Sequence, residues 1–441
     1  MSQPIPFQME ELLGWLRASI NTFPDKRTDG PNLHYSMKDV GLGAFSVFFT
    51  QSPSFLSYQA AMEKASGKSN AQTLFGMTQI PTDNHIRDIL DPIAPTHLNS
   101  VFASAYEALL GQGHLESYRS IHHTILIAMD GTQYHSSEKI HCKNCNCKTH
   151  KNGTQTYSHT VVTPVIVAPG KSRVFPLEPA FVIPQDGTEK QDCENAAAKR
   201  WIESFGDRCR ALGVTLLGDD LYCHQPLCEL VLRQNLNFIF TCKPDSHKTL
   251  YEWVVELDKL KTVSTVVNQY RHGTQRRIDT YRFVNQVPLR DGEDALNVNW
   301  CELTTTTIDG QIIYQNAFVT NHLIDSNNVV EIVAAGRTRW KIENENNNTL
   351  KTKGYHLTHN YGHGKQHLSS LLCTMIILSF LFHTLLEIGD DSYRQVRDAL
   401  PRRDTFFHDI RALTRYMCFE SWQALLHFMM VGLELIEADT T

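Results

Sequence analysis

A series of short apolar segments between residues 122 and 242 constrains the fold more than any other feature of the sequence. The segments TILIAMD, GTQYHSSEKI and YSHTVVTPVIVAP have the pattern of three strands, and the turn-forming pair Asp130-Gly131 joins the first two tightly. A long helical pattern, EKQDCENAAAKRWIESFGDRCRALG, follows them. VTLLG then predicts a fully buried strand, QPLCELVLRQN a helix and FIFTCK another strand. This order predicts an α/β fold whose sheet begins with antiparallel strands.

Changes in the hydrophobic period mark five regions in this chain of 441 residues, which is longer than one compact core usually allows. Amphipathic helical patterns fill both ends, and a β-rich insertion interrupts the α/β core before its last helix. The predicted regions are an N-terminal helical region at 1–117, the first part of the core at 118–261 with a Cys/His-rich loop at 141–159, the β-rich insertion at 262–325, the last part of the core at 326–365 and a C-terminal helical region at 366–441.

The composition is that of a water-soluble protein. The formal net charge of -6 argues against a uniformly basic nucleic-acid binder, although basic segments occur at 271–282 and 337–353. The sequence begins without a signal-peptide pattern, so we expect a cytoplasmic protein with mostly free thiols. The apolar stretch 368–389 approaches membrane-spanning length but contains several polar residues, and a buried core helix is the favoured interpretation. We therefore predict no membrane association.

Three acidic residues have the placement of a catalytic carboxylate cluster. Asp130 and Asp219 each follow a strand-like apolar run, and Glu343 lies far downstream in a helix-like segment. A carboxylate at the carboxyl end of a strand points into the crevice where α/β sheets bind ligands. Carboxylates from three distant parts of a chain can hold a pair of Mg²⁺ or Mn²⁺ ions, which serve in-line phosphoryl displacement. Adjacent residues in a strand face opposite ways, so only one of Asp219 and Asp220 can enter such a site.

If the segment around Glu343 is helical, one of its faces carries a stripe of polar and charged side chains. Arg339, Glu343, Asn347 and Lys351 are spaced four apart and so lie on one face, whereas Glu345 faces elsewhere. A metal ligand would then lie beside groups that can bind phosphate, Arg339 by paired hydrogen bonds and Lys351 by its charge. A solvated charged helix face is the alternative interpretation. The paired arginines Arg276 and Arg277 of the β-rich insertion are further candidates for DNA contact.

The loop HCKNCNCKTHKNGTQTYSH has the composition of a small zinc site. Cys142 and Cys145 form a Cys-x2-Cys pair, and His150 with His159 is the first choice for the other two ligands. Cys147 with one histidine, or Cys193 brought near by the fold, stays open as an alternative. Such a site would be structural, because four protein ligands leave no position for a substrate. The downstream histidines of GYHLTHNYGHGKQH, interrupted by glycines, are predicted to form a DNA-proximal loop rather than a second metal site.

These motifs resemble those of the DDE transposases of bacterial insertion sequences, in the group with a β-domain inserted between the second and third acidic residues. The resemblance rests on DGT at Asp130, GDDLY at Asp219 and the Arg-x3-Glu spacing of Arg339 and Glu343 in RWKIENENNNTLK. Gly336 occupies the Tyr position of the Tyr-x2-Arg-x3-Glu-x6-Lys signature. Leu350 occupies its Lys position, with Lys351 one residue late. The resemblance covers most of the chain.

The resemblance implies a ribonuclease-H-like catalytic core and metal-dependent cleavage and joining of DNA at the ends of an insertion element. It assigns Asp130, Asp219 and Glu343 to the Mg²⁺ or Mn²⁺ ions and a role in binding DNA ends to the N-terminal helices. Double-stranded DNA would be the partner, the working form would be a dimer on DNA, and the bound protein would be associated with the nucleoid. A metal-dependent nuclease without strand transfer, and a catalytically silent DNA-binding regulator, are the alternatives.

Overall fold

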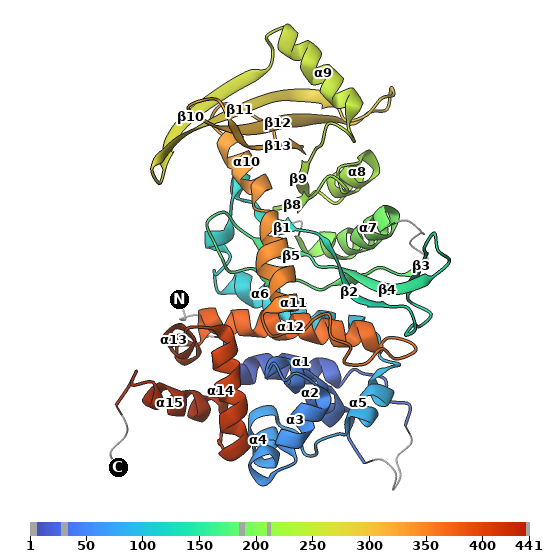
Figure 1. Cartoon of the computed structure of the whole chain (residues 1–441), viewed down its shortest axis with the longest axis vertical. Coiled ribbons are helices and arrows are strands. Elements are labelled where there is room, and N and C mark those ends of the chain that lie inside the picture. The colour runs from blue at the N-terminus through green and yellow to red at the C-terminus, as the bar shows by residue number, and fades with distance from the viewer. Residues whose placement is uncertain (1–6, 28–33, 185–189, 210–212, 438–441) are drawn as a thin grey trace.

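The computed structural model describes residues 7–27, 34–184, 190–209 and 213–437 of the chain. Nine of the described strands form one mixed sheet in the order β10-β11-β12-β13-β9-β8-β1-β5-β6. Helices lie on both sides of this sheet, and a helical layer closes one end of the molecule (Figure 1). The α/β class predicted from the sequence is therefore confirmed.

The centre of the sheet consists of β1 (Ile125–Ala128), β8 (Val214–Gly218) and β9 (Asn237–Thr241), which run parallel. β5 (Val165–Val167) pairs antiparallel with β1, and β6 (Phe175–Pro176) pairs with β5. Every residue of β1, β5 and β8 is buried, as expected for strands covered on both faces. The parallel strands place their carboxyl ends at one edge of the core.

A second sheet continues from the first. It contains β2 (Gly131–Ser137), β3 (Asn146–Thr149), β4 (Gln155–Val162) and β7 (Ala180–Phe181). The pairs Ala128↔Val165 and Gly131↔Val162 show that β1 with β2, and β4 with β5, form two long arms of one hairpin that bends between the sheets. The predicted tight turn at Asp130-Gly131 is therefore wrong. The chain stays extended there because both residues lie opposite the Val162 to Val165 segment, and Asp130 sits at the bend.

The β-rich region extends the main sheet. After α9 (Lys248–Lys259) come β10 (Ser264–His272), β11 (Gln275–Pro288), β12 (Asn297–Thr307) and β13 (Ile312–Thr320). All four pair antiparallel in chain order, and β13 then pairs with β9 through contacts such as Val319↔Phe240. The insertion is therefore continuous with the core. Among the described strands of the core, β9 is the one that pairs with it.

Helices cover the sheets from both sides. α7 (Lys190–Cys209) packs against β4, β7 and α8 (Gln225–Arg233), with the stacked rings of Trp201 and Phe205 buried beneath it. α10 (Val329–Arg337) packs on β9, β11 and β12. It leads into a π-helix at Ile342–Asn347 and the short α11 (Asn348–Thr352). The predicted helix around Glu343 is thus present, with a wider central turn.

The N-terminal and C-terminal helices pack together as one layer (Figure 1). α12 contacts α2, α14 contacts α4, and the indole of Trp422 donates a hydrogen bond to the carbonyl of Leu74. Their bounds are α1 (Met9–Ile20), α2 (Met37–Phe49), α3 (Phe55–Met62), α4 (Ala65–Phe75), α5 (Asp83–Leu90), α6 (Asn99–Gly111), α12 (Leu368–Gly389), α13 (Asp391–Ala399), α14 (Arg403–Tyr416) and α15 (Trp422–Gly432).

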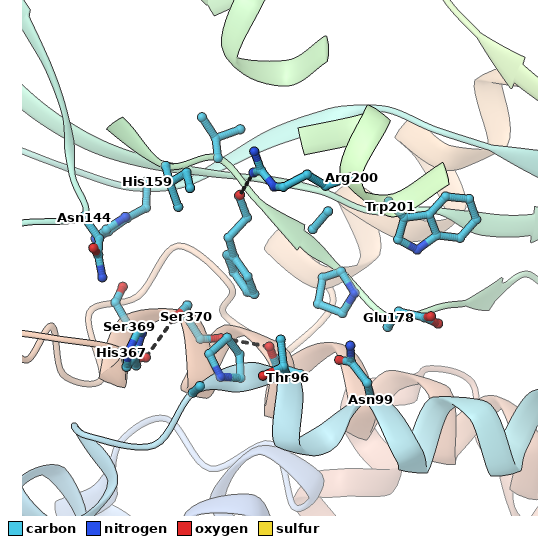
Figure 2. A pocket seen from close by; sticks show the side chains of 18 of the residues that line it. Thr96, Asn99, Asn144, His159, Glu178, Arg200, Trp201, His367, Ser369 and Ser370 are labelled. Carbon is cyan, nitrogen blue, oxygen red and sulfur yellow. Dashed lines mark hydrogen bonds between the residues drawn. The ribbon is translucent and has the colours of Figure 1, made fainter. Parts of the chain in front are cut away.

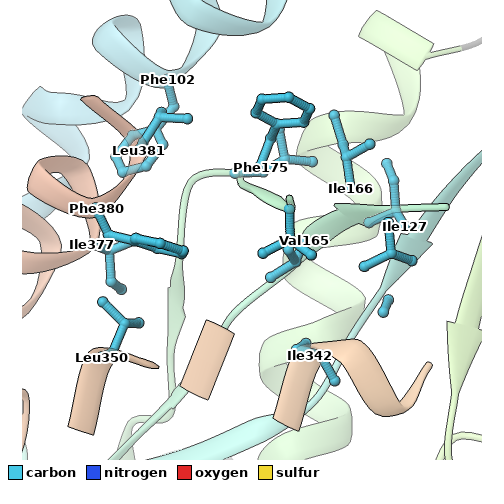
Figure 3. Packing of buried hydrophobic residues seen from close by; sticks show 14 of the residues in the cluster. Phe102, Ile127, Val165, Ile166, Phe175, Ile342, Leu350, Ile377, Phe380 and Leu381 are labelled. Carbon is cyan, nitrogen blue, oxygen red and sulfur yellow. The ribbon is translucent and has the colours of Figure 1, made fainter. Parts of the chain in front are cut away.

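The apolar α12 joins this layer to the sheet. Figure 3 shows Ile377, Phe380 and Leu381 of α12 near Phe102 of α6 and Phe175 of β6. By length and composition the helix could cross a membrane, but 89% of its apolar window is buried inside the protein. Its surroundings therefore support the prediction of a core helix. The side chains of Ile342 and Leu350 face the same core, which fixes the segment that carries Glu343 (Figure 3).

Candidate active site and metal centre

Asp130 and Asp219 occupy matching positions on neighbouring parallel strands. Ala128 of β1 lies opposite Leu217 of β8, and the Met129 amide donates to the Leu217 carbonyl at 2.9 Å. Two residues further on, this register brings Asp130 level with Asp219, just beyond the carboxyl ends of both strands. The predicted convergence of these two aspartates therefore follows from the strand pairing itself.

Asp130 is held firmly at the bend between the two sheets. Its carbonyl accepts a hydrogen bond from the Thr163 amide at 3.1 Å, and its carboxylate accepts one from the Asn347 side chain at 3.4 Å. Burial raises the pKa of Asp130 to about 7; Arg339 opposes this rise, while Asp219, Glu343 and Glu194 add to it. Three other carboxylates and one guanidinium thus lie close enough to Asp130 to shift its pKa. A cation there would relieve the repulsion between them.

Sequence reasoning missed Glu194. Its buried carboxylate fills the space beside Gly131 that a Cβ would need, which brings a fourth acidic group next to Asp130. The helical period gave a signal, because Glu194 lies one turn before Ala198 on the face of α7 that is buried. An acidic residue on an apolar helix face is uncommon without a partner or a function.

The structure separates the roles of the two adjacent aspartates. Asp220 accepts hydrogen bonds from the Lys243 amide at 2.7 Å and the Ser246 hydroxyl at 2.5 Å. Burial raises the pKa of Asp220, but hydrogen bonds from His247, Ser246 and Lys243 outweigh it and hold the pKa below its usual range. Asp220 therefore points toward the turn before α9. Asp219, whose Oδ1 accepts from the Leu221 amide at 2.9 Å, remains near Asp130.

Glu343 lies on the π-helix and pairs with Arg339. The Arg339 guanidinium and the Glu343 carboxylate are 2.9 Å apart, and the Glu343 side chain is 52% exposed. Single π-turns are rare and frequently occur at functional sites. Asn347, the next residue of the predicted stripe, reaches Asp130 as described, and Lys351 lies half-buried in α11. Three members of the predicted stripe therefore belong to the Asp130 cluster.

The arginines of the β-rich region lie elsewhere. Arg276 and Arg277 begin β11, opposite Arg271 and Tyr270 of β10. Three strands, β12, β13 and β9, separate β11 from β8 in the sheet order. The structure does not bring these two arginines into the carboxylate cluster.

The donor set suits hard divalent cations, which prefer carboxylate oxygens. Asp130, Asp219 and Glu343 do not form a single group whose ligand atoms all lie within 4.8 Å of one another. A pair of ions about 4 Å apart does not require this, because the outer ligands then lie on the order of 6–8 Å apart. In this structure Glu343 is paired with Arg339.

A second cluster contains sulfur and nitrogen ligands. Cys142, Cys145, His159 and His363 place one ligand atom each within 4.8 Å of all the others. The two Sγ atoms are 3.9 Å apart, and the Nε2 atoms of His159 and His363 are each 3.4 Å from Sγ of Cys145. A tetrahedral zinc ion with ordinary bond lengths separates its ligand atoms by about 3.5–3.8 Å. These four residues could therefore hold a metal ion such as zinc.

The ligand set differs from the first choice made from the sequence. His150 lies on the surface, where its Nε2 is 2.8 Å from the Thr156 hydroxyl, and His363 takes its place. Cys147 is exposed, and the side chain of Cys193 lies outside the described residues. The sequence predicts a DNA-proximal loop at His363, because glycines interrupt this segment. The Asn144 side chain, which donates to the Gln366 carbonyl at 2.5 Å, helps hold the two segments together.

A cavity of about 570 Å³ lies beside this Cys/His cluster and away from the carboxylates. Figure 2 shows Trp201 and Arg200 on one side of it and Ser369 and Thr96 on the other. Its acidic residue, Glu178, forms an ion pair with Arg208. With its carboxylate paired in this way, the cavity lacks the converging titratable groups of a catalytic site, so the carboxylate cluster is the stronger candidate.

Comparison of the sequence with family models and with curated proteins finds no match.

Proposed function

We propose that this protein is a DDE transposase that cleaves the DNA ends of an insertion element and joins them to a target. The observation that carries the proposal is the level placement of Asp130 and Asp219 at the ends of parallel β1 and β8. Glu343, more than a hundred residues downstream, contributes to the same electrostatic environment. Carboxylates converging from distant segments suit metal-dependent phosphoryl transfer.

The strand arrangement supports a ribonuclease-H-like core within this proposal. The order β6-β5-β1-β8-β9 combines two antiparallel partners on one side of β1 with two parallel strands on the other. The first two segments predicted as separate strands form one bent arm of the hairpin, and β6, which was not predicted, is the outer antiparallel strand. The β-rich region enters after β9 and returns before the helix of Glu343.

Each residue of the carboxylate cluster would have its own role in binding the ions and the DNA. Asp130 and Asp219 are fixed by the sheet and would hold Mg²⁺ or Mn²⁺, with Glu343 as the third ligand. When bound, such ions activate the attacking oxygen and stabilise the leaving 3′-oxygen. Arg339, released from Glu343, would bind the phosphate next to the scissile bond through paired hydrogen bonds. Asn347 would keep the Asp130 carboxylate oriented through the hydrogen bond already present.

The Cys/His cluster has a supporting role in the proposal. We assign Cys142, Cys145, His159 and His363 to a structural zinc ion, since four protein ligands close the coordination shell. The ion would fasten the hairpin loop to the segment that follows α11. His363 lies 11 residues after α11 ends at Thr352, so the zinc would limit the movement of the segment that follows the helix of Glu343.

The test is an assay of joined DNA products. Purified protein is incubated with Mn²⁺, a target plasmid and DNA fragments that span the genomic sequences flanking its gene. We expect free 3′-hydroxyl ends and then joined products, and Asp130→Asn should give neither. Cleavage without joining would instead identify a nuclease, and specific binding without cleavage would identify a regulator.

A further inference from the structure

A third group of ligand-type side chains lies on the other side of the turn that carries Asp219. Cys223, Cys242 and His247 place one ligand atom each within 4.8 Å of the other two, and all three residues are buried. Among the described residues, no fourth Cys, His, Asp or Glu satisfies the same distance to all three. The sequence signal, a Cys-x4-His pair at Cys242 and His247, is weak and was not recognised.

The fold brings these residues together from two turns, the one between β8 and α8 and the one between β9 and α9. Cys223 follows β8, Cys242 follows β9, and His247 precedes α9. Because β8 and β9 are parallel neighbours, with Gly218 opposite Phe240, both cysteines lie near the same edge of the sheet. The Cys242 amide donates to the Ala317 carbonyl at 2.9 Å, which fixes one cysteine in the frame of the sheet.

His247 has the environment of a metal-binding imidazole. It is 9% exposed, and its Nε2 atom is buried. Oδ1 of Asp220 lies 3.4 Å from that Nε2, which is a long distance for a hydrogen bond. Both oxygens of Asp220 already accept hydrogen bonds, from the Lys243 amide and the Ser246 hydroxyl. Asp220 is therefore suited to orient the His247 ring through Nε2, as carboxylates commonly do for metal-binding histidines, which leaves Nδ1 to bind the ion.

We propose that Cys223, Cys242 and His247 bind a zinc ion, separate from the Cys142 cluster and independent of the proposed DNA chemistry. Two thiolates and an imidazole are soft and borderline ligands, which favour Zn²⁺ over Mg²⁺. Binding transfers the two thiol protons to solvent, and water completes the fourth position. The ion ties the turn that holds Asp219 and Asp220 to the turn that begins α9.

Elemental analysis of the purified full-length chain tests this proposal. We expect two equivalents of zinc per chain, with one lost in Cys242→Ser and the other lost in Cys142→Ser. Cys301→Ala is the matched control, because Cys301 is a buried thiol two strands away from β9 and should leave both equivalents. Unchanged zinc content in a folded Cys242→Ser variant would overturn the proposal.

A measurement on the unaltered chain covers the case in which the serine variants fail to fold. The zinc-free protein is titrated with Co²⁺, whose thiolate charge-transfer absorption reports cysteine coordination. Saturation at two equivalents, both with thiolate absorption, supports the second site. Saturation at one equivalent, or a disulfide-linked Cys223 and Cys242 peptide found by mass spectrometry, overturns it.

Discussion

At the scale of single residues, Asp130 is the group whose charge state the fold controls most directly. Its pKa is raised from 3.8 to about 7, chiefly by burial, so between these pH values the ion-free protein takes up a proton on folding. The stability that this proton provides is fully present below about pH 3.8 and is lost as the pH rises through about 7. Divalent cations compete with the proton for the same oxygens.

We therefore predict that cation stabilisation depends on pH. Saturating Mn²⁺ should raise the melting temperature by about 2–4 °C at pH 8 and much less at pH 5.5. Differential scanning fluorimetry measures this, with Asp130→Asn as the control that should show no Mn²⁺ effect at either pH. An equal shift at both pH values in the unaltered protein would contradict the assignment.

The adjacent aspartates should respond differently to the same substitution. Asp219→Asn should reduce cleavage by about 10³-fold or more, because several kcal/mol of transition-state stabilisation is lost, while stability changes little. Asp220→Asn should lower the free energy of unfolding by about 1–3 kcal/mol, because it removes a charged acceptor from two hydrogen bonds. Measurements of the cleavage rate and of urea unfolding for both variants show which aspartate belongs to the active site. The reverse pattern would assign Asp220 to the active site.

Gly131 provides a steric test of the Glu194 contact. A methyl group at Gly131 would overlap the Glu194 carboxylate, so Gly131→Ala should cost about 1–3 kcal/mol of stability and impair cleavage. Gly111, at the end of α6, has open space around its Cβ position, and Gly111→Ala should be neutral or slightly stabilising. Thermal unfolding of the pair gives the comparison. Equal stability of both variants would show that Glu194 can move away.

At the scale of elements, periodicity predicted much of the fold. The buried run of β8 lies where its pattern predicts it, and β10 to β13 lie within the predicted β-rich region. The bend at Asp130 could not be predicted, because Asp-Gly is equally compatible with a turn and the decisive pairing partner lies at Val162. His363 was missed for a related reason. Its partner Cys145 is 218 residues away, and nothing local marks the contact.

The two candidate histidines offer a direct test of the Cys/His cluster. His363→Ala should release one equivalent of zinc and lower the melting temperature, because a structural site contributes its binding energy to the fold. His150→Ala is the matched control and should retain the metal, since its ring contacts Thr156 on the surface. Elemental analysis of both variants distinguishes the ligand sets. Zinc loss in His150→Ala alone would restore the set first chosen from the sequence.

At the scale of the whole molecule, the chain's two ends stabilise each other. Asn70 of α4 is fully buried; its amide donates to the carbonyls of Thr414 and Met417, and its oxygen accepts from the Phe419 amide. Asn70→Ala should lower the free energy of unfolding by about 2–4 kcal/mol, because three backbone groups lose their partner. Gln72→Ala, on the exposed side of α4, is the control. Urea denaturation measures both, and an unchanged midpoint for Asn70→Ala would contradict this coupling.

The contact between Cys145 and His363 also imposes an order of events during synthesis. Cys142, Cys145 and His159 leave the ribosome early, whereas His363 emerges only after the entire insertion and the Glu343 segment have been made. An ion bound by these three residues would lack its fourth ligand until His363, 218 residues after Cys145, has been synthesised. Completion of its shell would then coincide with the arrival of the last carboxylate. A chain that stops before His363 would therefore lack one ligand of this cluster.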